Sequence, residues 1–159
     1  VKVEYLHENT QLGTAGSLSL LPEKPNDTII VMNGDLITHT NFDNLLQFHH
    51  AQKAAATMVV REYDLQVPFG VVQLDGSIIQ GIEEKPLQQF FVNAGIYALS
   101  PNVLHYISAK SFFDMPTLFE KLITEGEKTV AYPLLENWLD IGRLEEFEKA
   151  RQEWKKNQT

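Results

Sequence analysis

The sequence predicts an α/β fold in which a mostly parallel sheet is covered by helices on both faces. Apolar runs typical of buried strands alternate along the chain with segments of helical periodicity, which is the pattern of such folds. The chain has 159 residues, 43% of them hydrophobic, enough for one domain with a sizeable core. Two further apolar runs flank Asp75-Gly76, a hairpin signal that adds an antiparallel element.

In the first part of the chain, turn-forming residues separate each apolar run from the next. Residues 1–6 have strand character and lead into the glycine turn 12–16. A short helix is expected over 17–21, because Pro22 cannot continue it. The apolar run 28–32 is typical of a buried strand.

A longer helix is expected over residues 42–53, since its apolar residues fall on one side and Asn41 is a suitable N-cap. The run 55–63 then predicts another strand. The predicted hairpin follows, with residues 70–74 and 77–79 as its two strands.

The second half of the chain repeats the alternation of strand and helix. Residues 91–99 predict a strand, 101–107 a short helix, and 114–125 a helix followed by a glycine placed to stop it. A strand is expected over 129–135. Apolar residues at helical spacing within a charged segment predict an amphipathic helix over 144–156.

Composition argues against several classes of function. The formal net charge of −8 argues against a nucleic-acid-binding surface, which needs a basic patch. The sequence has no cysteine, so it holds neither a disulfide framework nor a thiolate metal site, which fits a cytoplasmic location. No apolar run has membrane-spanning length, so a membrane is not an expected partner.

Polar residues break the apolar strand pattern at five places. These are Gly34-Asp35, Phe69-Gly70, Glu83-Glu84-Lys85-Pro86, Asn93-Ala94-Gly95 and Trp138-Leu139-Asp140-Ile141-Gly142. Each also has a purely structural interpretation: a turn, a bulge, a surface ion pair, or a cap on the last helix. Ligands, however, bind beyond the carboxyl ends of strands in open parallel sheets.

Two of these five places contain a carboxylate near a glycine at a strand end, namely Asp35 and Asp140. Two carboxylates are a minimal Mg²⁺ site when substrate phosphates and water complete the coordination. Lys85 suits a phosphate as a point charge, and neighbouring glycines let a ligand approach the backbone. Asp35 and Asp140 lie 105 positions apart, so only the fold could bring them together at such a site.

The same residues carry a resemblance to a known family. Six motifs occur in family order, and together they span most of the chain: LGTAGSL, VMNGD, FGVV, EEKP, NAGIY and WLDIGR. This sequence resembles the sugar-1-phosphate nucleotidyltransferases, and is most similar to their mannose-1-phosphate guanylyltransferase-like branch. The resemblance implies a Rossmann-like nucleotide-diphospho-sugar transferase sandwich. It also implies the reaction of a nucleoside triphosphate with a sugar 1-phosphate to give an NDP-sugar and pyrophosphate.

The resemblance implies a role for each motif residue. Asp35 and Asp140 would hold the catalytic Mg²⁺, with Gly34 beside them, and Lys85 would bind the sugar phosphate. The sugar would be lined by Gly70, Glu84, Asn93 and Gly95, and the base and ribose by Gly13, Thr14 and Gly16. The LGTAG segment resembles the guanylyl more than the thymidylyl branch, while the sugar stays open among mannose, an amino sugar and a heptose.

One family signature is missing from the 159 residues: the glycine-rich loop of the type GGxGTRLxPLT that cradles the nucleotide phosphates. We therefore expect residues 1–159 to be the C-terminal two-thirds of one catalytic domain, N-terminally truncated. The isolated chain is expected to be inactive and to self-associate as a homo-oligomer through strand edges left open.

Two other functions remain as alternatives. The first is a non-catalytic regulatory or sugar-nucleotide-binding module of the same fold, although retention of Asp35 and Asp140 favours a catalytic ancestry. The second is a phospho-acceptor receiver domain, for which Glu4 and Glu8 are poor candidates as the required acidic pair.

Overall fold

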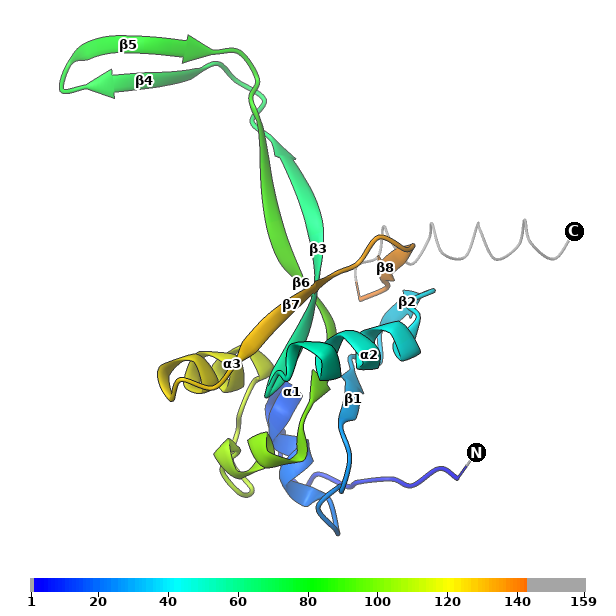
Figure 1. Cartoon of the computed structure of the whole chain (residues 1–159). Helices are drawn as coiled ribbons and strands as arrows, with labels where there is room; N and C mark the ends of the chain where they lie inside the picture. The colour runs from blue at the N-terminus through cyan, green and yellow to red at the C-terminus, as the bar shows by residue number, and fades with distance from the viewer. Residues whose placement is uncertain (1, 143–159) are drawn as a thin grey trace, which may run out of the picture.

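The computed structural model describes residues 2–142, and its elements form an α/β body from which a long arm extends (Figure 1). The helices are α1 (Gly13–Gly16), η1 (Ser17–Leu20), α2 (Phe42–Gln52), η2 (Pro101–Tyr106) and α3 (Met115–Thr124). The strands are β1 (Ile29–Met32), β2 (Leu36–Thr38), β3 (Ala56–Gln66), β4 (Val71–Asp75), β5 (Ile78–Glu83), β6 (Leu87–Leu99), β7 (Thr129–Pro133) and β8 (Trp138–Asp140). The helix expected over 144–156 lies outside the described residues.

The central sheet has the strand order β1-β6-β3-β7 and is covered on both faces. Side chains of β6 alternate between two cores, because successive residues of a strand point to opposite faces. Tyr97 and Leu99 pack with α3 in one core, whereas Ala94, Ile96 and Ala98 pack with Leu45 of α2 in the other. This two-faced burial confirms the α/β class.

The sheet is mixed: most of its strands share one direction, as expected, and β6 is the exception. Strands β1, β3 and β7 run in the same direction, but only β3 and β7 are hydrogen-bonded in parallel. Strand β6 lies between β1 and β3 and is antiparallel to both. The reason is that β6 returns directly from a hairpin arm that begins with β3, so it pairs with β3 in the opposite direction.

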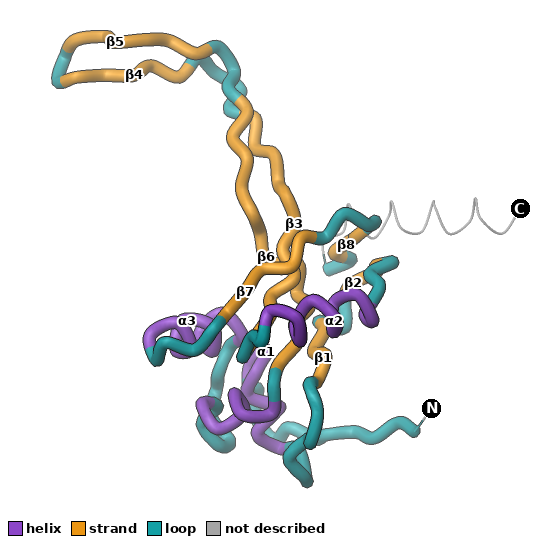
Figure 2. Tube along the Cα trace, in the orientation of Figure 1, coloured by secondary structure: helices purple, strands orange, loops and turns teal. Residues whose placement is uncertain are grey.

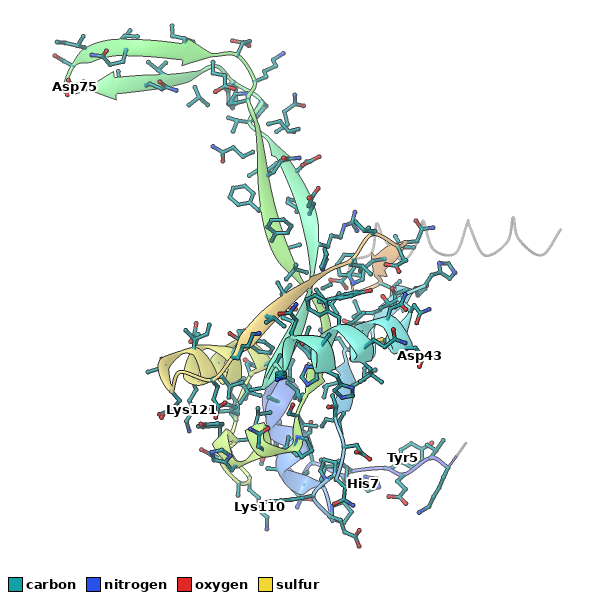
Figure 3. The ribbon with its side chains drawn as sticks, viewed as in Figure 1. Tyr5, His7, Asp43, Asp75, Lys110 and Lys121 are labelled. Atoms are coloured by element: carbon teal, nitrogen blue, oxygen red, sulfur yellow. The ribbon has the colours of Figure 1, made fainter. Side chains whose placement is uncertain are left out.

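The arm is formed by the outer halves of β3 and β6, which stay paired as far as Gln66 and Leu87 (Figure 1). It carries the predicted hairpin, β4 and β5, at its far end, where Asp75 marks the outer tip (Figures 2 and 3). The arm exposes large apolar side chains, namely Tyr63, Leu65, Phe69, Val72, Leu74, Ile78, Ile79, Ile82, Leu87, Phe90 and Phe91. Strands β3 and β6 are thus longer than predicted, and most of the added length lies outside the core.

Other predicted elements are found close to their expected positions, with some exceptions. Asn41 caps α2 as expected, since its side chain accepts a hydrogen bond from the Asn44 backbone N–H at 3.1 Å. The strand expected at the N-terminus is wrong for the described residues 2–6, which form no strand and lie exposed. The short strands β2 and β8 were not predicted, and α1 forms one helical turn where a glycine turn was expected.

A buried histidine joins α2 to the sheet. The His49 side chain is 1% exposed; its Nδ1 lies 2.7 Å from Thr57 Oγ1 and its Nε2 lies 2.9 Å from Ser100 Oγ. The Ser100 hydroxyl donates its one proton to the Ala54 carbonyl at 3.0 Å, so it accepts from His49 Nε2–H. His49 Nδ1 therefore accepts from the Thr57 hydroxyl, and the ring fits this network only as neutral imidazole.

We expect this network to make stability depend on pH. Burial, with a smaller contribution from His50, holds the pKa of His49 below its ordinary value of 6.5. The unfolded chain then binds the extra proton first, so this stabilisation is complete above about pH 6.5 and is lost as pH falls below it. One such group adds a slope of at most about 1.4 kcal/mol per pH unit. Urea unfolding curves recorded between pH 7.5 and 5.5 give the free energy of unfolding at each pH. This free energy should change less with pH for His49→Gln than for wild type.

The matched control is His7→Gln, which changes an exposed histidine in the region without regular structure. It should leave the pH dependence of the free energy of unfolding unchanged. Equal slopes for wild type and His49→Gln would contradict the prediction.

Candidate functional site

The chain brings Asp35 and Asp140 side by side. Asp35 follows β1 and directly precedes β2, and β2 pairs antiparallel with β8 so that Leu36 lies opposite Asp140. The Ile141 backbone N–H donates to the Asp35 carbonyl at 2.9 Å, which extends the pairing by one more link. Residues 105 positions apart in the sequence are thus placed together by two short strands.

Both carboxylates face the space above Gly142. A Cβ built on Gly142 would lie 2.9 Å from Asp35 Oδ2 and 3.1 Å from Asp140 Oδ1. Since both oxygens lie near one point, their separation cannot exceed the sum of these distances, about 6 Å. The Gly142 backbone N–H also donates to Asp140 Oδ1 at 3.0 Å and fixes the direction of that carboxylate.

The donor set and the space between the carboxylates fit a Mg²⁺ ion. Carboxylate oxygens are the ligands that Mg²⁺ prefers, and ligation at about 2.1 Å places two shared oxygens within about 4.2 Å of each other. The upper limit of about 6 Å on the separation of Asp35 Oδ2 and Asp140 Oδ1 is compatible with this value. No cluster of three or more histidine, cysteine or acidic residues able to hold a metal occurs among residues 2–142. The predicted site has only two carboxylates, and substrate phosphates would supply further ligands, so it does not require such a cluster. Mg²⁺ binding itself stays a prediction.

Asn93 and Gly95 of β6 lie next to the end of β1, the strand that leads to Asp35. The Asn93 side chain donates to the Tyr97 hydroxyl at 2.7 Å and accepts from the Gly95 backbone N–H at 2.9 Å. Gly95 has a φ of +72°, and a Cβ there would lie 2.8 Å from Asn33 Nδ2. The Asn33 backbone N–H donates to the Gly95 carbonyl at 2.9 Å, so Asn33 belongs to the site together with its neighbours Gly34 and Asp35, although no separate role was predicted for it.

Gly34 leaves open space in front of the backbone beside Asp35. A Cβ on Gly34 would meet no atom within 4 Å. Such open space is what the close approach of a ligand to this peptide would require.

Of the residues predicted for the sugar and its phosphate, Gly70, Glu84 and Lys85 lie on the arm. A Cβ on Gly70 would lie 2.9 Å from Glu84 Oε2, so these two predicted residues are neighbours. Lys85 follows at the junction of β5 and β6, which Figure 1 shows well away from β2 and β8. The structure does not bring these residues to Asp35 and Asp140.

The backbone of Lys85 is not extended, although a residue before proline usually is. Its φ is +48°, in the left-handed region. A following proline chiefly disfavours the right-handed helical region, and here the chain must turn sharply to begin β6. The Val67 backbone N–H donates to the Pro86 carbonyl at 3.0 Å and closes this turn across the arm.

Gly13, Thr14 and Gly16 pack against the N-terminus of α3. Thr14 donates through its backbone N–H and its hydroxyl to Asp114 Oδ1, at 3.0 and 3.2 Å. Its Oγ1 accepts from the Met115 backbone N–H at 2.8 Å and thereby caps α3 from a distant part of the chain. A Cβ on Gly13 would lie 2.7 Å from Asp114 Oδ1, so this segment has a structural role that the sequence did not reveal.

An open groove of about 770 Å³ runs from Asp140 along the root of the arm. One wall comes from β3 and β6 and the other from the segment that leads into β8. Its lining includes Arg61, Tyr63, Phe91, Trp138 and Asp140. The groove thus adjoins the carboxylate pair and offers a cation and aromatic rings next to it.

With this geometry in place, comparison with known proteins decides the family. The model of the family described as Nucleotidyl transferase matches residues 1–157. The chain belongs to the nucleotidyl transferase family. Family membership agrees with the order of the six motifs, of which two supply the carboxylate pair.

Two similar proteins are both named as enzymes that act on mannose 1-phosphate. The chain is 33% identical to "Mannose-1-phosphate guanyltransferase" of Pichia angusta, and the match covers 92% of this chain and 42% of that protein. It is 35% identical to "Mannose-1-phosphate guanylyltransferase catalytic subunit beta" of Drosophila pseudoobscura pseudoobscura, over 92% of this chain and 41% of the relative. The chain therefore spans about two fifths of the length of these relatives.

Solved structures support the fold. HddC from Yersinia pseudotuberculosis matches 92% of this chain and 64% of its own, with a TM-score of 0.64 and 21% identity. The same protein complexed with GMP-PN gives a TM-score of 0.66 at 21% identity, with the same coverage of both chains. The Rossmann-like nucleotidyltransferase fold is thereby confirmed. Among residues 2–142, no helix is both long and apolar enough to cross a membrane.

Proposed function

We propose that this chain is part of an enzyme that transfers a nucleotidyl group from GTP to mannose 1-phosphate, or to a closely related sugar 1-phosphate. The products are a GDP-sugar and pyrophosphate. The observation that carries the proposal is the convergence of Asp35 and Asp140 on one space, next to a glycine that leaves it free. The names of the 33–35% identical relatives favour GTP and mannose 1-phosphate among the possible substrates.

The proposed reaction is a substitution at the α-phosphorus of the nucleotide. A phosphate oxygen of the sugar 1-phosphate forms the new P–O bond, while the bond to the bridging α,β-oxygen breaks and pyrophosphate leaves with its electron pair. Two anions must approach each other, so positioning and neutralisation of charge account for most of the catalysis. A bound Mg²⁺ would supply Lewis-acid stabilisation of the charge on the phosphates.

Different residues would bind the metal ion, the sugar phosphate and the nucleotide. Asp35 and Asp140 would hold the ion, and the open peptide at Gly34 lets a phosphate come close to them. Lys85 would bind the sugar phosphate and Glu84 the sugar hydroxyls, with Gly70 beside Glu84 on the arm. Asn93 and Gly95, which lie near Asn33 on the body, would line the other part of the sugar pocket. Gly13, Thr14 and Gly16 would lie against the base and ribose, in addition to their contacts with α3.

Several narrower statements belong to the same proposal. The 159 residues contain no glycine-rich phosphate loop, so we propose that the chain alone does not turn over. Exposed apolar residues of the arm favour self-association into a homo-oligomer, and the lack of cysteine favours the cytoplasm. A non-catalytic nucleotide-sugar-binding module is the alternative.

The test is pyrophosphate release by the protein expressed from its complete reading frame, with each of four nucleoside triphosphates and a panel of sugar 1-phosphates. We expect Mg²⁺-dependent release that is fastest with GTP and a mannose-type sugar, and no release from the 159-residue chain. Substrate binding without pyrophosphate release by the complete protein would support the non-catalytic alternative. Turnover by the 159 residues alone would show that they already contain the phosphate-binding groups.

A further inference from the structure

The strand that carries Asp140 has few links to the rest of the molecule. Strands β2 and β8 have three residues each and form a two-stranded sheet of their own, beside the four-stranded one (Figure 2). A two-stranded ribbon is marginally stable by itself, so its side chains must hold it in place. Trp138 provides this anchor, because its indole Nε1–H donates to the Ala94 carbonyl of β6 at 2.8 Å.

Arg61 holds Trp138 from the other side of the groove. Its Nη1 donates to the Trp138 carbonyl at 3.2 Å, and its guanidinium carbon lies 5.3 Å from the centre of the indole ring. The second contact is a cation–π interaction, which orients the ring as well as the backbone. Within residues 2–142, no carboxylate forms a salt bridge with Arg61, so this cation is directed to Trp138 and not to an acidic partner.

The position of Trp138 determines the position of Asp140. Residues two apart in a strand point to the same face, about 6.6 Å from each other along the strand. Leu36, opposite Asp140 in the ladder, packs with Trp138 against the core that contains Ala94. A displacement of the indole therefore moves β8 and the Asp140 carboxylate relative to Asp35.

We propose that Arg61 is a positioning residue for the metal-binding carboxylate pair. It clamps Trp138 and so keeps Asp140 at the separation from Asp35 that one ion requires. The inference rests on the proposed function only for the identity of the ligand. The contacts of Arg61 with Trp138 hold β8 in place whichever ligand binds. Arg61 contacts neither carboxylate, and its effect passes through Trp138.

The first measurement uses Mn²⁺ in place of Mg²⁺, because Mn²⁺ quenches tryptophan fluorescence. The measurement uses the 159-residue chain, which has two tryptophans, so Trp154→Phe leaves Trp138 as its single tryptophan reporter. In this background, Arg61→Ala should weaken Mn²⁺ binding by about tenfold or more, as loss of outer-shell support commonly does. Arg61→Lys, which keeps the charge, should recover part of the affinity. Lys24→Ala, which removes an exposed cation from another loop, should leave the affinity unchanged.

The second measurement does not depend on any metal. Amide hydrogen exchange of Ile141 reports the β2–β8 pairing, because this N–H is bonded to the Asp35 carbonyl. Arg61→Ala should accelerate exchange at Ile141 at least about tenfold and leave core amides such as Leu99 unchanged. Unchanged exchange at Ile141 would overturn the inference, as would equal acceleration throughout the core. If wild type binds no Mn²⁺, the metal proposal fails, and the exchange result still decides the role of Arg61.

Discussion

Replacing Asp140 by asparagine should lower pyrophosphate release by the complete protein at least about a hundredfold, with little loss of stability. Asparagine has the same shape, and its side-chain oxygen can still accept the hydrogen bond from the Gly142 backbone N–H. What it removes is one of the two negative charges within about 6 Å of each other. Without metal these charges repel, so Asp140→Asn should leave the melting temperature unchanged or raise it.

The matching variant Asp35→Asn should behave in the same way, and the double variant should be little worse than either single one. Residues that act as one unit give non-additive losses, whereas independent contributions would multiply. Asp27→Asn, which changes an exposed acid outside the site, is the control for charge alone. Full activity in either single variant would exclude a shared ion. A large fall in melting temperature would instead indicate a structural role for the carboxylates.

Replacing Gly142 by alanine should abolish most metal binding while the fold stays intact. The added methyl group would lie 2.9 Å from Asp35 Oδ2 and 3.1 Å from Asp140 Oδ1, in the space where a shared ion must sit. Gly142 does not have the left-handed backbone that would itself disfavour alanine. The carboxylates must move outward, and we expect Mg²⁺ affinity to fall by about 10–100-fold. Calorimetric titration with Mg²⁺ and a melting curve measure the two effects separately.

Gly81→Ala is the matched control, because a Cβ there would meet only the end of the Gln73 side chain at 3.4 Å. It tests the cost of a glycine-to-alanine change on a strand away from the carboxylates. Unaltered Mg²⁺ affinity in Gly142→Ala would mean that the ion does not occupy the space between Asp35 and Asp140.

Local chemistry made some features predictable from the sequence. Asn41 could be assigned as a cap because its side chain satisfies a free N–H of α2, which requires no distant partner. The Asp75-Gly76 turn was predictable because Gly76 takes the positive φ of 59° that such a hairpin needs. The pairing of Asp35 with Asp140 followed from family motifs, since nothing local relates two residues so far apart in sequence.

Features that depend on tertiary contacts could not be predicted. Strands β2 and β8 have three residues each, too few for an alternating pattern, and they exist because they pair with each other. Thr14 caps α3 across 101 positions, a relation that only the folded chain creates. Residues near the N-terminus have strand-like composition, but residues 2–6 find no strand to pair with in the described structure.

The arm also has a consequence for the timing of catalysis. The two carboxylates lie on the body of the molecule, whereas the segment that contains Glu84 and Lys85 lies on the arm, beyond the register shift between Met58 and Val60 of β3. A β-bulge of this kind bends a strand, so a small rotation there becomes a large displacement farther out. If both groups bind one substrate, the arm must bend inward to bring Lys85 to the carboxylates. Motions of this size take microseconds to milliseconds, so turnover would respond to solvent viscosity as well as to the chemistry of phosphate transfer.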